Sequence, residues 1–182
     1  MKWMIASDIH GSAYYARQLL DAFDRSGANR LLLLGDLLYH GPRNALPAEY
    51  DPPQVIGLLN AYAERICCVR GNCDSEVDQM VLHFPILADY AVLPFGTRLI
   101  YAAHGHHPVP PLQPGDILLN GHTHVVAHEP RAHYLYWNPG SVSIPKEDTP
   151  RSYMLLTETE CSWHRLADDR ETFRFPVDAE CR

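Results

Sequence analysis

Short apolar segments that end directly in polar clusters constrain the fold of this chain more than any other feature. Each segment has the length of a buried strand, and each cluster follows where that strand would stop. In α/β sheets the loops beyond the carboxyl ends of the strands converge on one crevice, so side chains far apart in the sequence are expected to meet there. The clusters are Asp8-x-His10, Gly35-Asp36, Gly71-Asn72, His104-Gly105-His106 and Gly121-His122-Thr123-His124.

The first half of the chain is predicted to alternate strands and helices. A strand over 3–7 precedes a helix over 13–23, whose apolar residues recur at helical spacing, and a buried strand over 31–34 follows. A strand–helix–strand unit forms a parallel pair with a right-handed crossover. The same half is expected to contain a helix over about 53–62, a strand over 66–69 and a short helix within 73–84.

The second half is predicted to be mostly β, because helical periodicity is largely missing after Phe84. The Pro-rich stretch Pro108–Pro114 is expected to be a loop rather than a linker, so residues 1–182 are predicted to form a single domain. That domain would be of the α/β class, with two sheets that bury the apolar content of the chain. The expected strands are 90–92, 97–103, 117–119, 125–128, 134–137 and 153–157.

Composition excludes several classes of partner and location. The net charge of −7 disfavours a broad face for duplex nucleic acid or anionic lipid, because such binding requires many Lys and Arg. No apolar run approaches the roughly 20 residues that a membrane span needs. The chain reaches Asp8 and His10 after a short apolar segment, so no signal peptide is expected. The five cysteines are an odd number and indicate free thiols, which predicts a cytoplasmic protein.

The polar clusters contain the donor atoms of a metal site. Carboxylate oxygen, amide oxygen and imidazole nitrogen suit divalent Mn, Fe, Co or Zn. The clusters offer more ligands than one ion needs, which favours two ions that share a bridging group. Two such ions can clamp a phosphate and generate a hydroxide nucleophile.

Plainer interpretations exist for each polar feature taken alone. Gly35-Asp36 and Gly71-Asn72 are also common turn sequences, and only the joint order of the clusters favours a site. Ser141 and Ser143 lack the Gly-x-Ser-x-Gly elbow of a nucleophilic serine and are expected to form a turn that supports the site. The remaining histidines are interpreted as surface or packing residues: His40, His83, His107, His128, His133 and His164.

The order of these clusters resembles the signature of the calcineurin-like metallophosphoesterases, from the first strand to Lys146. Within that superfamily, four segments resemble the small YfcE-type bacterial phosphodiesterases. These segments are Ser7–Gly11, His40–Asn44, Arg70–Asp74 and Asn138–Ser141. The resemblance implies a two-sheet sandwich flanked by helices, with the metal site in loops at the C-terminal ends of the strands.

The resemblance also implies which residues bind two divalent ions. Asp8, His10, Asp36 and His124 would hold one ion, and Asp36, Asn72, His104 and His122 the other, with Asp36 bridging. His104 is preferred over His106 because the first histidine of this segment is the ligand in the family. His106 would orient a ligand or line the pocket. Oxygen-rich ligation favours Mn, with Fe, Co, Ni or Zn as alternatives.

One position departs from the family pattern, in which a histidine follows the Gly-Asn pair. Here the sequence reads Gly71-Asn72-Cys73-Asp74. In the family that histidine is thought to protonate the leaving oxygen or stabilise the transition state. A thiol is a weak hydrogen-bond donor, so Cys73 is a poor substitute, and efficient cleavage of esters with poor leaving groups is not expected. Alternatively, Cys73 is a small packing residue.

The sequence therefore predicts a metal-dependent phosphodiesterase in which a metal-bridging hydroxide attacks a small phosphodiester. Alternatives are a phosphomonoesterase or nucleotidase using the same site, and a catalytically weak protein-binding scaffold. The expected catalytic residues are Asp36, Asn72, Cys73 and His104, and the expected substrate-binding residues are Arg43, Asn44 and His106. The aromatic strand over 134–137 permits a homodimer without requiring one.

Overall fold

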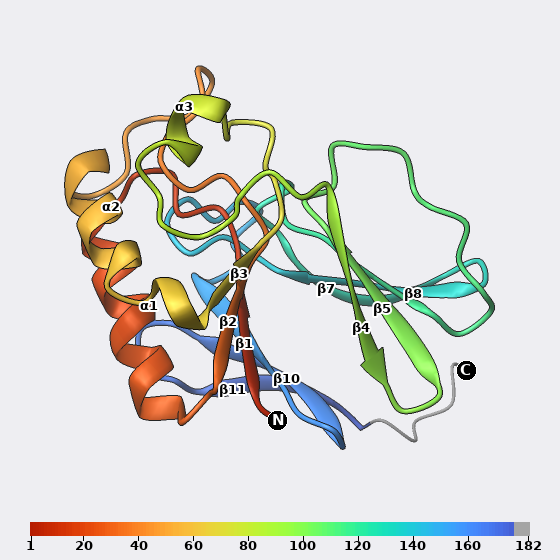
Figure 1. Ribbon diagram of the computed structural model, residues 1–182. Helices are drawn as coiled ribbons and strands as arrows, with labels where there is room; N and C mark the ends of the chain where they lie inside the picture. Colours follow the sequence, from red (N-terminus) through yellow and green to blue (C-terminus); the bar gives the residue numbers. More distant parts are fainter. Residues whose placement is uncertain (177–182) are drawn as a thin grey trace.

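A six-stranded sheet and a five-stranded sheet pack face to face, and helices cover the outer face of the first sheet (Figure 1). This computed structural model describes residues 1–176. The arrangement confirms the predicted α/β class and the two-sheet sandwich flanked by helices.

The first sheet combines parallel and antiparallel strands. Its N-terminal strands β1 (Trp3–Ala6), β2 (Arg30–Leu33) and β3 (Ile66–Cys68) are parallel, as the strand–helix–strand pattern predicts. On the other side of β1 lie three antiparallel strands, giving the order β11-β10-β9-β1-β2-β3. These strands are β9 (Ser152–Leu156), β10 (Glu160–Arg165) and β11 (Glu171–Pro176), of which β10 and β11 were not predicted from the sequence.

The helices begin and end at residues suited to their caps. In α1 (Ala13–Ser26) the Ser12 side chain accepts a hydrogen bond from the N–H of Tyr15, and Gly27 ends the helix at φ 67°, a left-handed conformation that costs glycine little. Asp51 caps α2 (Pro52–Asn60) in the same way. The short elements η1 (Ala63–Arg65) and α3 (Glu76–Gln79) follow. No helix formed by residues 1–176 has the length and apolar character needed to cross a bilayer.

The second sheet is also mixed, with the order β4-β5-β6-β8-β7. Strands β5, β6 and β8 run parallel, so their C-terminal ends lie at one edge of the sheet. The edge strands β4 and β7 are antiparallel to their neighbours. The strands are β4 (Tyr90–Phe95), β5 (Arg98–Ala103), β6 (Ile117–Leu119), β7 (Val126–Arg131) and β8 (Tyr134–Pro139).

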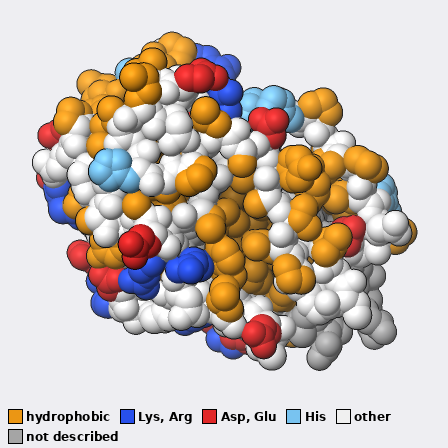
Figure 2. Space-filling view, in the orientation of Figure 1, with side chains coloured by type: hydrophobic (Ala, Val, Ile, Leu, Met, Phe, Trp, Pro, Cys, Tyr) orange, Lys and Arg blue, Asp and Glu red, His pale blue; other side chains and the backbone are white. Residues whose placement is uncertain are grey.

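A core forms between the two sheets. Ile5 and Leu32 of the first sheet pack against Ile100 and Trp137 of the second, and all four side chains are buried. Within the aromatic strand over 134–137, Leu135, Tyr136 and Trp137 are buried and Tyr134 is half-buried. The outer face of the second sheet instead exposes hydrophobic side chains over β4 and β5, including Tyr90, Val92 and Leu99 (Figure 2).

Candidate metal centre

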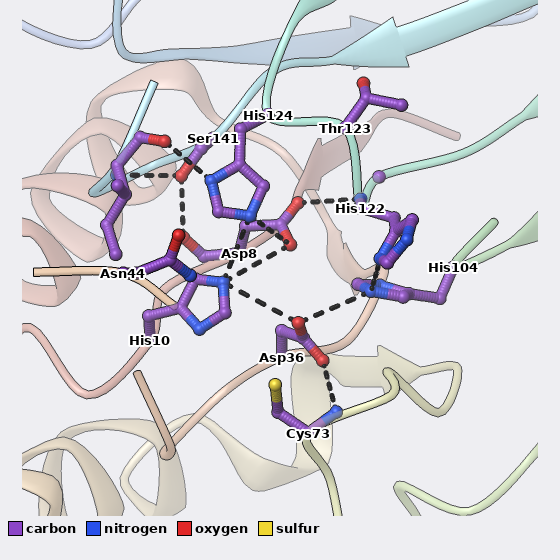
Figure 3. A network of polar contacts seen from close by, with 12 residues as sticks. Asp8, His10, Asp36, Asn44, Cys73, His104, His122, Thr123, His124 and Ser141 are labelled. Atoms are coloured by element: carbon purple, nitrogen blue, oxygen red, sulfur yellow. Dashed lines mark hydrogen bonds and ion pairs between the residues drawn. The ribbon is translucent and has the colours of Figure 1, made fainter. Parts of the chain in front are cut away.

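The loops that follow five strands meet at one place and bring the expected ligands together (Figure 3). Asp8 and His10 follow β1, and Asp36 follows β2. Asn72 and Cys73 follow β3. His104 follows β5, and His122 and His124 follow β6. Strands of both sheets therefore contribute to the same centre.

Three of the histidines are held in one tautomer by main-chain carbonyls. The Nδ1 atoms of His10, His104 and His124 lie 2.7, 2.6 and 2.6 Å from the carbonyl oxygens of Tyr39, Leu34 and Ile144. A carbonyl only accepts hydrogen bonds, so Nδ1 carries the proton and Nε2 of the neutral ring presents a lone pair. Orientation of this kind is typical of metal-binding histidines.

The free ring nitrogens face one another at distances that call for a cation between them. Nε2 of His10 lies 3.2 Å from Nε2 of His124, and Nε2 of His104 lies 3.2 Å from Nδ1 of His122. The buried Oδ1 of Asp8 has no hydrogen-bond partner among the described residues and lies 3.6 and 3.4 Å from Nε2 of His10 and of His124. Lone pairs and a carboxylate directed at one point fit a divalent ion.

Asp36 lies between the two histidine pairs (Figure 3). Its Oδ2 is 3.6 Å from Nε2 of His10 and 3.4 Å from Nε2 of His104. Oδ1 of Asn72 lies 3.1 Å from the same nitrogen of His104. This is the placement expected of a carboxylate shared by two ions.

Electrostatic coupling within the cluster is strong in the metal-free chain. Burial disfavours the charged form of Asp8, yet His10 and His124 hold the pKa of its carboxyl well below the usual range. Burial likewise opposes protonation of His104, but Asp36 and Asp8 raise its pKa to about 9. Carboxylates and imidazoles coupled in this way bind a proton where a metal ion would bind, so metal binding is expected to release protons.

Five of the seven expected ligands adopt left-handed backbone conformations. For a residue with a side chain this costs of order 1–3 kcal/mol, and such residues concentrate at functional sites because surrounding structure must hold them. The residues are Asp8, His10, Asp36, His122 and His124, with φ of 60, 51, 57, 65 and 63°.

Asp74 fixes two of the ligand loops and was not predicted to do so. Its buried carboxylate accepts hydrogen bonds from the backbone N–H groups of Asp36, Leu37 and Gly71, at 2.8, 2.9 and 2.7 Å. The loops after β2 and β3 are thereby joined through one side chain. Its place directly after Gly71-Asn72-Cys73 was the available sequence signal.

The turn after β8 supports the loop after β1, as expected. The hydroxyls of Ser141 and Ser143 donate hydrogen bonds of 2.9 and 3.0 Å to the carbonyl oxygen of Asp8. Both serines are buried, and neither hydroxyl faces the cleft as a nucleophile would.

A cleft of about 440 Å³ opens onto the ligands. The expected substrate-binding residues Arg43 and Asn44 line it, as does Cys73, but His106 does not. The ring of His106 lies 5.4 Å from that of His104 and 6.4 Å from that of His122, outside the cleft lining. Thr123 and Lys146 also line the cleft, and neither was singled out as a functional residue from the sequence.

Cys73 places both its backbone and its thiol next to Asp36. Its N–H donates a 2.8 Å hydrogen bond to Oδ1 of that carboxylate, and the thiol is half-buried at the cleft wall. Burial, together with the negative charge of Asp36, raises the pKa of the thiol to about 12. The thiol is therefore protonated at neutral pH and is a weaker acid than an ordinary cysteine.

Comparison with known proteins agrees with this geometry. Residues 1–160 match the model of the calcineurin-like phosphoesterase superfamily domain. The chain is 49% identical over 172 residues to phosphodiesterase YfcE of Escherichia coli K12, covering 92% of this chain and 94% of that protein. It is 29% identical over 186 residues to the probable metallophosphoesterase YsnB of Bacillus subtilis, covering 96% and 90% of the two chains.

Solved structures give the same result. The structure of YfcE, a phosphoesterase from E. coli, superposes with a TM-score of 0.91 at 45% identity, and the match covers 98% of this chain and 100% of the other. The family expected from the order of the polar clusters is confirmed: the chain belongs to the calcineurin-like phosphoesterase superfamily.

Proposed function

We propose that this protein is a metal-dependent phosphodiesterase with two divalent ions. The observation that carries the proposal is the convergence of oriented imidazole nitrogens on two buried carboxylates, with Asp36 between the two histidine pairs. The 49% identity to a protein named phosphodiesterase supports the reaction class.

Each ion would have four ligands from the chain, and Asp36 would belong to both sets. Asp8, His10, Asp36 and His124 would bind the first ion, and Asp36, Asn72, His104 and His122 the second. Ions bound there would activate a water molecule and neutralise charge on the phosphoryl oxygens. The chain itself contributes by positioning: carbonyl groups fix the imidazoles, and Asp74 and the Cys73 N–H fix Asp36.

The substrate would lie in the cleft with its leaving group near Cys73. A thiol is a weak hydrogen-bond donor, and burial raises the pKa of the Cys73 thiol, so Cys73 is a poor proton donor to a departing oxygen. Leaving groups that depart as stable anions would therefore be favoured. The same deficit disfavours the phosphomonoesterase and nucleotidase alternatives. A protein-binding scaffold is disfavoured because all seven expected ligand positions are filled. Arg43 and Asn44 would contact the phosphate or its substituents, and His106 would orient its neighbour His104.

The chain's donor set supports Mn as the resident metal. The seven proposed ligands are four imidazoles, two carboxylates and one amide, without a thiolate. The oxygen donors suit Mn, which we propose as the resident metal, and the imidazoles make Fe, Co, Ni or Zn the alternatives. The described cysteines are unpaired, which supports the expected cytoplasmic location.

We also place residues 1–182 in one domain, because both sheets contribute to one core and one centre. With a net charge of −7, duplex nucleic acid and membranes are not expected partners.

A homodimer is also part of this proposal. We place the contact with a second copy on the outer face over β4 and β5, where Tyr90, Val92 and Leu99 are exposed. Sedimentation velocity on the wild type and on Val92→Glu would test it. A monomeric wild type would contradict the dimer without affecting the proposed activity.

The reaction class is tested by a screen of chromogenic esters. Metal-free protein would be assayed with bis(4-nitrophenyl) phosphate and with 4-nitrophenyl phosphate, with Mn, Fe, Co, Ni or Zn added back separately. We expect the diester to be hydrolysed faster than the monoester, and Mn to give the highest rate. Hydrolysis of the monoester alone would favour the phosphomonoesterase alternative.

A further inference from the structure

We propose that Arg43 and Lys146 form a second anion-binding subsite in the cleft, and that the preferred substrate is a phosphodiester with a phosphomonoester on one of its arms. This inference rests on the proposed phosphodiesterase function and narrows its substrate class.

Arg43 and Lys146 differ from the other described cations in having no partner. Within residues 1–176, every other Lys and Arg side chain has a hydrogen bond, an ion pair, a ring contact or a charge interaction with a neighbouring carboxylate. The two cations without one line the same cleft. The chain has 22 acidic and 15 basic residues, so carboxylates are plentiful for pairing elsewhere on the surface.

Arg43 is held at the tip of a closed turn. The Asn44 side chain donates a 2.9 Å hydrogen bond to the carbonyl of His40, and the Asn44 N–H donates to the carbonyl of Gly41 at 3.4 Å. Gly41 packs close to the thiol of Cys73. The turn is therefore anchored beside the metal centre, while the Arg43 side chain itself is exposed to the cleft.

Lys146 reaches the cleft from a different loop, which is tied to a metal-site residue. The Lys146 N–H donates a 3.1 Å hydrogen bond to the carbonyl of His124. The Thr149 hydroxyl donates a 2.9 Å hydrogen bond to the carbonyl of Lys146. The next residue, Glu147, has φ of 52° and lines a separate hollow with Arg131. Glu147 does not line the cleft that Lys146 lines, and no ion pair joins the two side chains within residues 1–176.

The charge of the cleft fits an anion in addition to the diester. A phosphodiester has a single negative charge, which the divalent ions would neutralise at the centre. Asp36 is the one carboxylate among the residues that line the cleft, and it is a proposed metal ligand. Arg43 and Lys146 are therefore available to bind a second anionic group of the substrate. A phosphomonoester has a charge of about −1.5 to −2 at pH 7 and three acceptor oxygens that suit the guanidinium fork.

The test compares two diesters that differ only in this group. Thymidine 5′-(4-nitrophenyl phosphate) and its 3′-phosphorylated form release the same 4-nitrophenolate, so the nucleoside serves as a carrier for the added phosphate. For the Mn-loaded wild type, we expect kcat/KM to be about tenfold higher for the 3′-phosphorylated diester, mainly through KM. Arg43→Gln and Lys146→Gln should each lower this ratio about threefold, the size expected for one exposed charge pair. Arg170→Gln, an exposed cation in the β10–β11 turn, should change neither rate.

Binding provides a readout that does not need turnover. Calorimetry on the Mn-loaded protein would compare thymidine 3′,5′-bisphosphate with thymidine 5′-phosphate, in the wild type and the same variants. If the protein hydrolyses neither diester but binds the bisphosphate about tenfold tighter than the 5′-phosphate, the subsite is supported and the proposed activity is overturned. Equal binding of the two nucleotides, or an unchanged ratio in both cleft variants, overturns the subsite even when the diesters are hydrolysed.

Discussion

The backbone N–H of Cys73 donates a 2.8 Å hydrogen bond to Oδ1 of Asp36 and so fixes which oxygen of that carboxylate faces the histidines. The other oxygen, Oδ2, is left for His10 and His104, at 3.6 and 3.4 Å. One main-chain contact thus aligns the carboxylate that both metal sites would share.

Asp36 is expected to be the most sensitive ligand because it would serve both ions. Asp36→Asn keeps the shape of the side chain and removes the charge, so we expect at least about a 100-fold loss of diesterase activity and weak metal binding, with the fold retained. Circular dichroism, metal content and activity would be measured together.

His133→Ala is the matched control for Asp36→Asn. His133 is exposed and does not line the cleft, so its replacement should leave metal content and activity almost unchanged. Similar behaviour of the two variants in a Mn-reconstituted assay would contradict the assignment of the site.

Removal of metal should abolish hydrolysis, because the charge of both ions would be needed at the attacking and phosphoryl oxygens. Dialysis against EDTA should eliminate activity, and Mn should restore it best. Metal should also raise Tm, because the ions bind the folded state, and a ligand at about 100 times its Kd adds roughly 2.7 kcal/mol. Full activity in excess chelator after dialysis would contradict a metal mechanism.

Asp74 is expected to matter for stability as well as for metal binding. Asp74→Ala would leave the N–H groups of Asp36, Leu37 and Gly71 unpaired in a buried loop, which should cost about 3 kcal/mol of unfolding free energy. Urea denaturation of the metal-free protein measures this cost. The control is Asp168→Ala, which removes an exposed carboxylate paired with Arg165 and should change the unfolding free energy much less, because exposed ion pairs contribute little. Equal losses in the two variants would show that Asp74 does not organise the loops.

Local sequence patterns were sufficient to predict most of the fold. The parallel strands β1 to β3 and helix α1 were expected, because an apolar run or a helical spacing marks each of them. The final hairpin was missed even though Cys161 and Trp163 in β10, and Phe173 and Phe175 in β11, alternate with polar residues. That β9 returns to pair with β1 depends on contacts between residues about 150 positions apart, which no local pattern reveals.

The candidate site was predictable where residue type and order determine it, and less so where loop packing does. The expected ligands are typical metal-binding residues in the family order, and the structure brings them together. Asp74 was missed because its role depends on the close approach of Gly71 to the backbone of the Asp36 loop. Lys146 was missed because a single exposed lysine has no sequence signal for the cleft it enters.

The last prediction concerns the cysteine at the position where the family has a histidine. An activated aryl diester leaves as a stable phenolate and needs little proton donation, whereas an alkyl diester leaves as a basic alkoxide and needs much. The Cys73 thiol is a weak donor, and its burial raises its pKa further, so it supplies that proton poorly at neutral pH. Wild-type activity should therefore fall steeply as the leaving group becomes more basic.

Cys73→His would place an imidazole, with an ordinary pKa near 6.5, at the cleft wall. We expect it to increase kcat/KM more for an alkyl diester than for an aryl diester, by a factor that approaches the lower end of the roughly 10²–10⁴ range of general acid catalysis. The bulkier ring must fit next to Gly41, which lies close to the thiol, so some loss of Tm is compatible with this gain.

A packing role for Cys73 predicts the opposite result, because an imidazole forced into a thiol's space would only destabilise the protein. Measurement of kcat/KM for one aryl and one alkyl diester, in the wild type and in Cys73→His, distinguishes the two roles. An equal loss on both substrates, with a lowered Tm, would assign Cys73 to packing and remove the physical basis for leaving-group selectivity.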